Sequence, residues 1–348
     1  MDTFTLEQLD FSEIQRAMDE ILNQSFSFRD TVLSLLSGEQ PFTLESFFRT
    51  ALTEAGRSFT QDKQIFVSIL VLGIAAALLK NFTDVFKNDQ IGEISFEMTY
   101  LLLFLLLLQV FSGAAKLAGQ VFASVQEFMK ALIPAWCLAV TLSAGGATAL
   151  VFYQFLLGLI YALDWLIGEA LLPVLNLYML LVFINHLTKE EYLSQMTELT
   201  GKGVGWLLKT LLAAVAGFNA IQGMITPALD ALKNTAFTRA LRVLPGIGNV
   251  AGGVTDLLLG SAVLLKNGVG AAAVLVLALI CLGPLVKLGV LFLLLKGTAA
   301  LIQPVCDKRF SGCVSGAGEG VRLLFQAVFT VTVLFVVTIV VVTVSVRG

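Results

Sequence analysis

The chain has 348 residues, of which 57% are hydrophobic and 14% are charged, and its formal net charge is -3. Soluble domains carry about 25% charged residues, so a chain this apolar needs lipid as part of its solvent. The sequence contains no basic tract of the kind that binds nucleic acid. We therefore expect an all-α polytopic membrane protein with the lipid bilayer as a partner and no nucleic acid.

Residues 1–62 form a polar, acidic segment ahead of the apolar part of the chain. The motif Ser12-Glu13-Ile14-Gln15 fits a capping box at the start of a helix. A second amphipathic stretch runs from Leu44 to Gly56. The simpler interpretation is two short helices packed on the membrane domain, which would span residues 63–348. The alternative is a docking module for a partner outside the bilayer.

Nine apolar windows follow Lys63. A helix needs about 20 residues to cross the hydrocarbon, and the windows predict seven to nine transmembrane or re-entrant helices. The last window is rich in Val and Thr, but an open strand in lipid leaves its backbone unsatisfied, so we expect a helix there. The windows are 65–79, 98–112, 131–142, 148–168, 171–187, 204–222, 268–283, 285–302 and 323–346.

Two pairs of prolines share one spacing of 111 residues, Pro134 with Pro245 and Pro173 with Pro284. The sequences around them are similar, which suggests an internal repeat, a frequent design in transporters. Chance similarity between Leu-rich helices is the alternative. The predicted halves are about 98–205 and 206–321.

Proline and glycine are also expected to break these helices, because proline lacks the N–H that continues a helix. A break at Pro284 predicts a hairpin over 268–302. That hairpin would bring the basic loops 228–243 and 303–322 to the same side of the membrane, which the positive-inside rule makes cytoplasmic.

A dinucleotide fingerprint matches residues 246–251 as a string of letters. The fingerprint requires a preceding strand and an acidic residue about 20 positions later, where this chain has Lys266 and Asn267. We therefore expect no nucleotide cofactor and interpret the stretch as a helix break beside a close-packing surface. The residues of this break are Pro245, Gly246, Gly248, Gly252 and Gly253.

Several charged residues lie within or near apolar windows, where charges are costly and often functional. Asp164 is the deepest acid by its position in a window, and it could pair with Lys130 or Lys287 or line a polar path. An interfacial position is the alternative. Lys209 and Lys296 lie near window ends, where a side chain can reach the membrane surface. The intramembrane candidates are Lys130, Asp164, Glu169 and Lys287.

No catalytic pattern is found, and the chain has one histidine, His186. The four cysteines form no CxxC pair, although a disulfide between Cys306 and Cys313 remains open. We expect no enzyme activity, no cofactor and no metal site.

The run GFNAIQGMITPALDALKNTAFTRALRVLPGIGNVAGGVTDLLLGSAVLLKNGVG (217–270) resembles the signature region of the stage III sporulation protein AE family. After the Pro284 helix pair, LIQPVCD (301–307) resembles the family's QP-x-x-D segment. The likeness extends from about residue 60 to the C-terminus. The positions that it marks as structurally critical are Pro245, Gly246, Gly248, Asp256, Lys266, Asn267, Gln303, Pro304 and Asp307.

The resemblance implies a polytopic membrane protein of endospore-forming bacteria, made in the mother cell and located in the membrane around the forespore. It also implies a secretion-like channel complex with other stage III sporulation proteins and a forespore membrane partner, and a permease-like homo-oligomer is expected. Members of the family carry a cleavable signal, so residues 1–62 are expected outside the cytoplasm. A stand-alone permease or secondary transporter, and a non-conducting scaffold, are the alternatives.

Overall fold

The computed structural model describes residues 11–22, 27–38, 44–85, 89–144, 146–187, 190, 192–242 and 248–345, and all regular elements within them are helical. The helices are α1 (Ser12–Ile21), α2 (Phe28–Leu36), α3 (Leu44–Val85), α4 (Asp89–Ala144), α5 (Gly146–Trp165), the π-helix η1 (Leu166–Leu171), α6 (Leu172–Leu187), α7 (Ser194–Arg242), α8 (Gly248–Ile302) and α9 (Lys308–Ser345).

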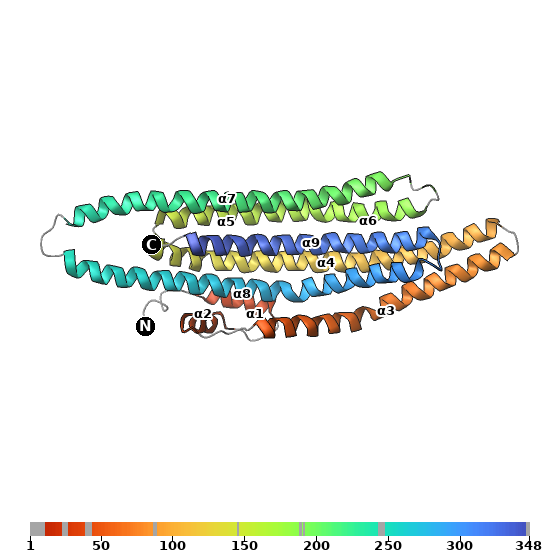
Figure 1. The fold of residues 1–348 in the computed structure, drawn as a ribbon, viewed down its shortest axis with the longest axis horizontal. Helices are drawn as coiled ribbons and strands as arrows, with labels where there is room; N and C mark the ends of the chain where they lie inside the picture. Colours follow the sequence, from red (N-terminus) through yellow and green to blue (C-terminus); the bar gives the residue numbers. More distant parts are fainter. Residues whose placement is uncertain are drawn as a thin grey trace.

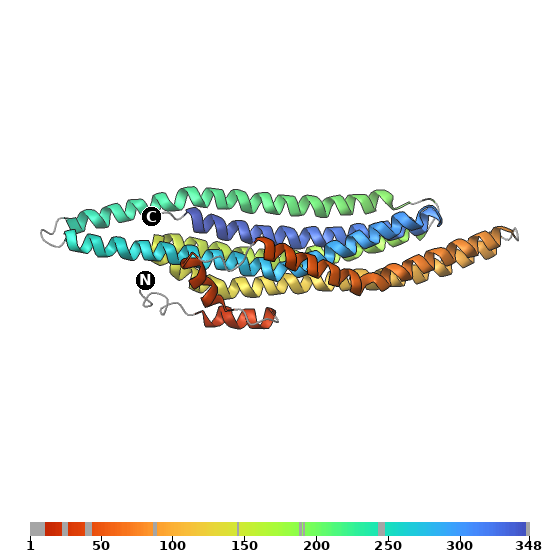
Figure 2. The same ribbon diagram turned by 60° about the horizontal axis from the view of Figure 1, so that its bottom comes forward.

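The long helices form an elongated bundle in which consecutive rods run in opposite directions (Figures 1 and 2). The segments α5, η1 and α6 form one continuous rod. In the described part of the chain, six helices are long and apolar enough to cross a membrane. The expectation of an all-α polytopic membrane protein is therefore confirmed, with six long helices in place of the seven to nine expected from the windows.

The difference arises because neighbouring windows merge into single helices. Pro134 lies inside α4 and Pro284 inside α8, so the expected hairpin over 268–302 is wrong. The regions 228–243 and 303–322 consequently flank opposite ends of α8 (Figure 1). For a helix surrounded by lipid and other helices, a break costs more free energy than one missing hydrogen bond. A break leaves several backbone groups unpaired where no water is present to bind them.

The length of these helices exceeds one hydrocarbon layer. Helix α4 has 56 residues, and at about 1.5 Å per residue it is about 84 Å long, against about 30 Å for the bilayer core. Part of each long helix must therefore lie outside the hydrocarbon or inside other protein.

The rod between α5 and α6 contains the irregularity expected near a proline. The π-helical turn η1 ends two residues before Pro173, and the N–H of Leu172 bonds to the carbonyl of Ile167, five residues back. Pro173 has no N–H and its ring crowds the carbonyl four residues earlier, so a wider turn accommodates it. Its partner Pro284 lies inside α8 without a π-helical turn, and Pro245 lies outside the described residues. The internal repeat stays a prediction.

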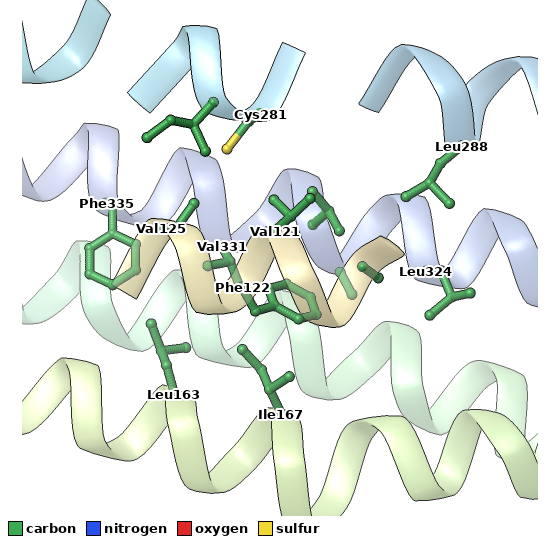
Figure 3. Packing of buried hydrophobic residues seen from close by; sticks show 14 of the residues in the cluster. Val121, Phe122, Val125, Leu163, Ile167, Cys281, Leu288, Leu324, Val331 and Phe335 are labelled. Atoms are coloured by element: carbon green, nitrogen blue, oxygen red, sulfur yellow. The ribbon is translucent and has the colours of Figure 1, made fainter. Parts of the chain in front are cut away.

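Helices α4 and α9 form the centre of the bundle. Helix α9 packs against α4, α6, α7 and α8, and its Val331 and Phe335 lie among side chains of α4, α5 and α8 (Figure 3). The other faces of the rods expose large apolar side chains such as Leu105 and Leu293. An apolar outer surface of this kind is suited to lipid and unsuited to water.

Three glycines of α9 allow it to approach its neighbours closely. Gly312, Gly316 and Gly320 are four residues apart and lie on one face of the helix. A Cβ atom at Gly316 would collide with Val182 of α6, and one at Gly320 would lie 3.0 Å from Phe111 of α4. Small residues at this spacing are typical of close helix contacts in membranes.

The N-terminal helices pack on the bundle, with α1 against α4 and α2 against α8. The N-cap of α1 is Phe11 without a side-chain hydrogen bond, so the predicted capping box at Ser12 is wrong. Helix α2, which was not predicted, is capped instead: Ser27 accepts a hydrogen bond from the N–H of Asp30. The side chain of Gln15 joins the two helices by accepting from the N–H of Phe28 at 3.0 Å.

The second amphipathic stretch forms the first turns of α3, which continues without interruption past residue 62. The proposed division between residues 1–62 and 63–348 therefore falls within one helix.

Candidate functional site

The turn between α8 and α9 contains three of the residues marked by the family resemblance. The N–H of Gln303 still bonds to the carbonyl of Ala299, but Pro304 has no N–H and the helix ends. Asp307 then caps α9, because its Oδ1 accepts from the N–H of Arg309 at 3.0 Å. Gln303 and Pro304 are exposed at this end of the bundle.

Arg309 connects this turn to two other helices. Its guanidinium lies 3.7 Å from the centre of the Phe96 ring in α4. The same group lies 3.4 Å from Asp307 Oδ1 and donates to the carbonyl of Leu187, at the end of α6, at 3.4 Å. A cation held by a ring, a carboxylate and a carbonyl joins three helices at one point.

Cys306 attaches the turn to α3, since its thiol donates to the carbonyl of Gly73 at 3.1 Å. Burial raises the pKa of Cys306, and the nearby Asp307 carboxylate raises it further. The thiol is therefore protonated at neutral pH and can donate. Cys306 and Cys313 are both free, so the disulfide left open by the sequence does not form.

A second polar cluster lies deeper, between α8 and α9. Arg322 donates to Glu319 Oε1 from Nε at 2.8 Å, and Lys296 Nζ lies 3.7 Å from Glu319 Oε2. Lys296 also donates to Ser315 Oγ at 3.0 Å. Lys296 thus reaches a carboxylate of the neighbouring helix.

Glu319 and Arg322 were missed by the sequence analysis, which placed 303–322 in a loop. The structure begins α9 at Lys308, so that both side chains lie on one face of a helix. An acidic and a basic residue three positions apart is the spacing that pairs on a helix, and this signal was available in the sequence.

A cavity of about 430 Å³ with a mixed polar and apolar lining lies between α3, α4 and α8. Asp62 and Lys287 both line it, together with Gln64, Ser68 and Gln109. The two charged groups do not form an ion pair within 4.0 Å, and Asp62 Oδ2 is buried without a hydrogen-bond partner. Polar groups gathered among apolar helices mark a place for a polar ligand, an ion or water.

The other intramembrane candidates lie on the outside. Asp164 of α5 and Glu169 of η1 are exposed. Lys130 is also exposed, beside a cavity of about 450 Å³ between α1 and α4. The pairing considered for Asp164 with Lys130 or Lys287 is not formed, because Lys287 faces the cavity that contains Asp62.

The motif residues of α8 have different surroundings. Lys266 is fully buried in the bundle, whereas the adjacent Asn267 is exposed beside a cavity of about 450 Å³ near Leu35 and Thr343. Helix α7 ends at Arg242 and α8 begins at Gly248, so Pro245 and Gly246 lie between two helices and outside the described residues. Gly252, Gly253 and Asp256 belong to the first turns of α8, where side chains lie outside the described residues.

The chemistry available to these groups is electrostatic. Among the described residues, no group of three or more His, Cys, Asp and Glu side chains is arranged to hold a metal ion. The clusters can join helices by buried hydrogen bonds and can place charge within the apolar bundle.

Comparison with known proteins identifies the family. No solved structure matches the chain. A protein of Bacillus subtilis (strain 168) called Stage III sporulation protein AE is 22% identical over 317 residues, which cover 91% of this chain and 79% of that protein. The family described as Stage III sporulation protein AE matches residues 26–346, which is most of the chain. The chain therefore belongs to the stage III sporulation protein AE family, and the family implies a role in sporulation.

Proposed function

We propose that this chain is a non-enzymatic membrane component of a secretion-like channel complex between mother cell and forespore. It would act in the mother-cell membrane around the forespore, with other stage III sporulation proteins and a forespore membrane partner, and would form or anchor the conduit. The observation that supports this most is the family match over residues 26–346 in a chain with six long apolar helices.

The polar clusters support a role in an assembly. The charged groups at Glu319, Arg322 and Lys296 lie in helices that are otherwise apolar enough for lipid. Charges at such depth are stable when they are paired, or when protein or water covers them. Long helices that extend past one hydrocarbon layer also provide surface for partners on both sides of a membrane.

Deletion of the gene in the spore-forming source should stop development after engulfment of the forespore. The reason is that the proposed conduit would lack its anchor, or part of its wall, in the mother-cell membrane. Phase-bright spores would be counted and engulfment scored by membrane staining, with the wild-type gene at a second locus as control. Normal spore counts in the deletion strain would rule out the proposed function.

A stand-alone transporter of a small polar solute is a second candidate, because the cavity with Asp62 and Lys287 has room for such a solute. The purified chain alone in liposomes would then accumulate labelled amino acids or inorganic ions, and Asp62→Asn would abolish the uptake. We expect no uptake by the purified chain alone, since a conduit requires its partners. Uptake that is lost in Asp62→Asn would replace the channel proposal with the transporter. A scaffold without a pore would show no conductance in the complete complex.

A further inference from the structure

The α5–η1 segment and helix α7 carry opposite charges on their outer surfaces. Asp164 and Glu169 are exposed on the first, and Lys209 is exposed on the second. We call Asp164 and Glu169 the acidic face, and Lys209 with the adjacent Trp206 the basic face. In the described part of the chain, none of the three charged groups forms an ion pair.

Two contacts establish how α7 runs beside the α5–α6 rod. The rings of Phe155 and Phe218 stack with their centres 4.4 Å apart. Gly201 lies against the ring of Tyr178. Because the two rods are antiparallel (Figure 1), the stretch from 155 to 178 runs beside the stretch from 218 back to 201.

The acidic and basic faces therefore lie at one level along the bundle. Asp164 and Glu169 fall between the two contacts on one rod, and Lys209 falls between them on the other. A neighbouring copy with the same orientation in the membrane would present its acidic face at the height of this basic face.

The side chains of Asp164 and Lys209 point in opposite directions. A helix turns about 100° per residue, so residues nine positions apart lie on opposite sides. Phe155 faces α7, and Asp164 is nine positions later on α5. Phe218 faces α5, and Lys209 is nine positions earlier on α7. One molecule therefore cannot join its own Asp164 to its own Lys209.

The two acids lie in the middle of a candidate membrane span, where lipid would not suit a charge. No charged residue occurs from 146 to 163, nor from 170 to 188, so Asp164 and Glu169 lie between two apolar stretches of one candidate span. Placing them at the membrane surface would leave one of these stretches, which expose side chains such as Leu177, in water. An exposed acid at this depth requires a partner.

The basic face borders a cleft of about 810 Å³ between α6, α7 and α9. Two other cations that line the cleft are already paired, Lys202 with Glu198 and Arg322 with Glu319. Lys209 is the lysine of the lining that has no ion pair within the described residues and can bind an acidic group of another molecule. Trp206 at the cleft is 71% exposed and Trp165 beside the acidic face is 66% exposed, so each face has a large apolar side chain for packing.

We propose that copies of this chain assemble head to tail, with the acidic face of one copy against the basic face of the next. The contact uses two different surfaces, so it leaves one of each free and continues to further copies. Because Asp164 and Lys209 point in opposite directions, repetition gives a row of copies in the membrane, which closes into a ring when each contact adds a small rotation about the bilayer normal. This inference specifies the assembly within the proposed function, and it rests on that function only for the use of the assembly.

Cysteine cross-linking in native membranes tests the arrangement. The full chain with Asp164→Cys and Lys209→Cys together should give a ladder of dimers, trimers and larger products on a non-reducing gel after mild oxidation. Each single variant should stay monomeric. Leu150→Cys with Lys209→Cys is the matched control, because Leu150 lies on the same side of α5 as Asp164 but 14 residues, or about 21 Å, away along the helix.

Charge reversal gives an independent measurement. Asp164→Lys and Lys209→Asp should each reduce the oligomer fraction on a native gel about tenfold, and the double variant should restore it, because the two charges then attract again. Absence of the ladder, or a dimer formed by Asp164→Cys alone, would overturn the head-to-tail contact. If the ladder is absent in a strain that sporulates normally, the contact is wrong while the role in sporulation stands.

Discussion

Gly316→Leu should prevent the bundle from folding correctly. A Cβ atom at position 316 already collides with Val182 of α6, and the rest of a leucine side chain would force α6 and α9 apart. Val182 is buried and branched at its Cβ, so it cannot rotate out of the way at low cost. Overpacking typically destabilises by about 1–3 kcal/mol, and we expect the upper end or more here because α9 contacts four neighbours. The thermal unfolding of the purified variant in detergent and its amount in the membrane would measure the loss.

Gly203→Leu is the matched control for this substitution. A Cβ atom at position 203 of α7 meets nothing within 4 Å. The change there removes a flexible glycine from a helix, which should stabilise by roughly 0.5–1 kcal/mol. The interpretation fails if both leucine variants unfold at the same temperature, because the effect would then follow from removing glycine and not from the α6–α9 contact.

Asp307→Ala should loosen the α8–α9 end of the bundle. The substitution removes the cap that accepts from the N–H of Arg309 and also the carboxylate beside the Arg309 guanidinium. Loss of an N-cap destabilises by about 0.5–2 kcal/mol, and an Arg side chain that is 14% exposed loses its charged partner as well. We expect a total of about 2–3 kcal/mol, visible as a lower unfolding temperature and as faster proteolysis after residues 303–309.

Asp307→Asn separates the two contributions. Asparagine caps helices about as well as aspartate but carries no charge. The Asn variant should therefore regain the stability that the cap contributes. It should lose only the stability that comes from the charge beside Arg309. Equal destabilisation by alanine and asparagine would show that the cap contributes little.

Much of the fold could be predicted from the sequence. The uncharged Val-rich window at 323–346 forms helix as expected over its described residues, which end at Ser345 of α9. Each apolar window lies on a long helix because lipid permits few other backbone structures. The number of helices was overestimated, because a proline such as Pro284 breaks a helix or continues it depending on the neighbours that pack around it.

The candidate site was less predictable. The position of Asp164 in its apolar window predicted the deepest acid in the membrane, but in the structure its side chain is exposed on the outside of the bundle. Asp62, which was assigned to the polar segment before the first window, lies beside a cavity with Lys287. Position in an apolar window indicates depth along a helix, but it carries no information about the direction in which the side chain points.

The sequence by itself determined that the chain is an all-helical membrane protein and, through the runs at 217–270 and 301–307, which family it resembles. Both follow from local properties: hydropathy over about 20 residues and the order of short motifs. Only the tertiary structure decided that α8 continues through Pro284, that Arg309 joins three helices, and that Asp164 and Lys209 point outward in opposite directions. These features depend on the rotation and register of each helix against its neighbours, which are set by side-chain packing between segments far apart in the chain.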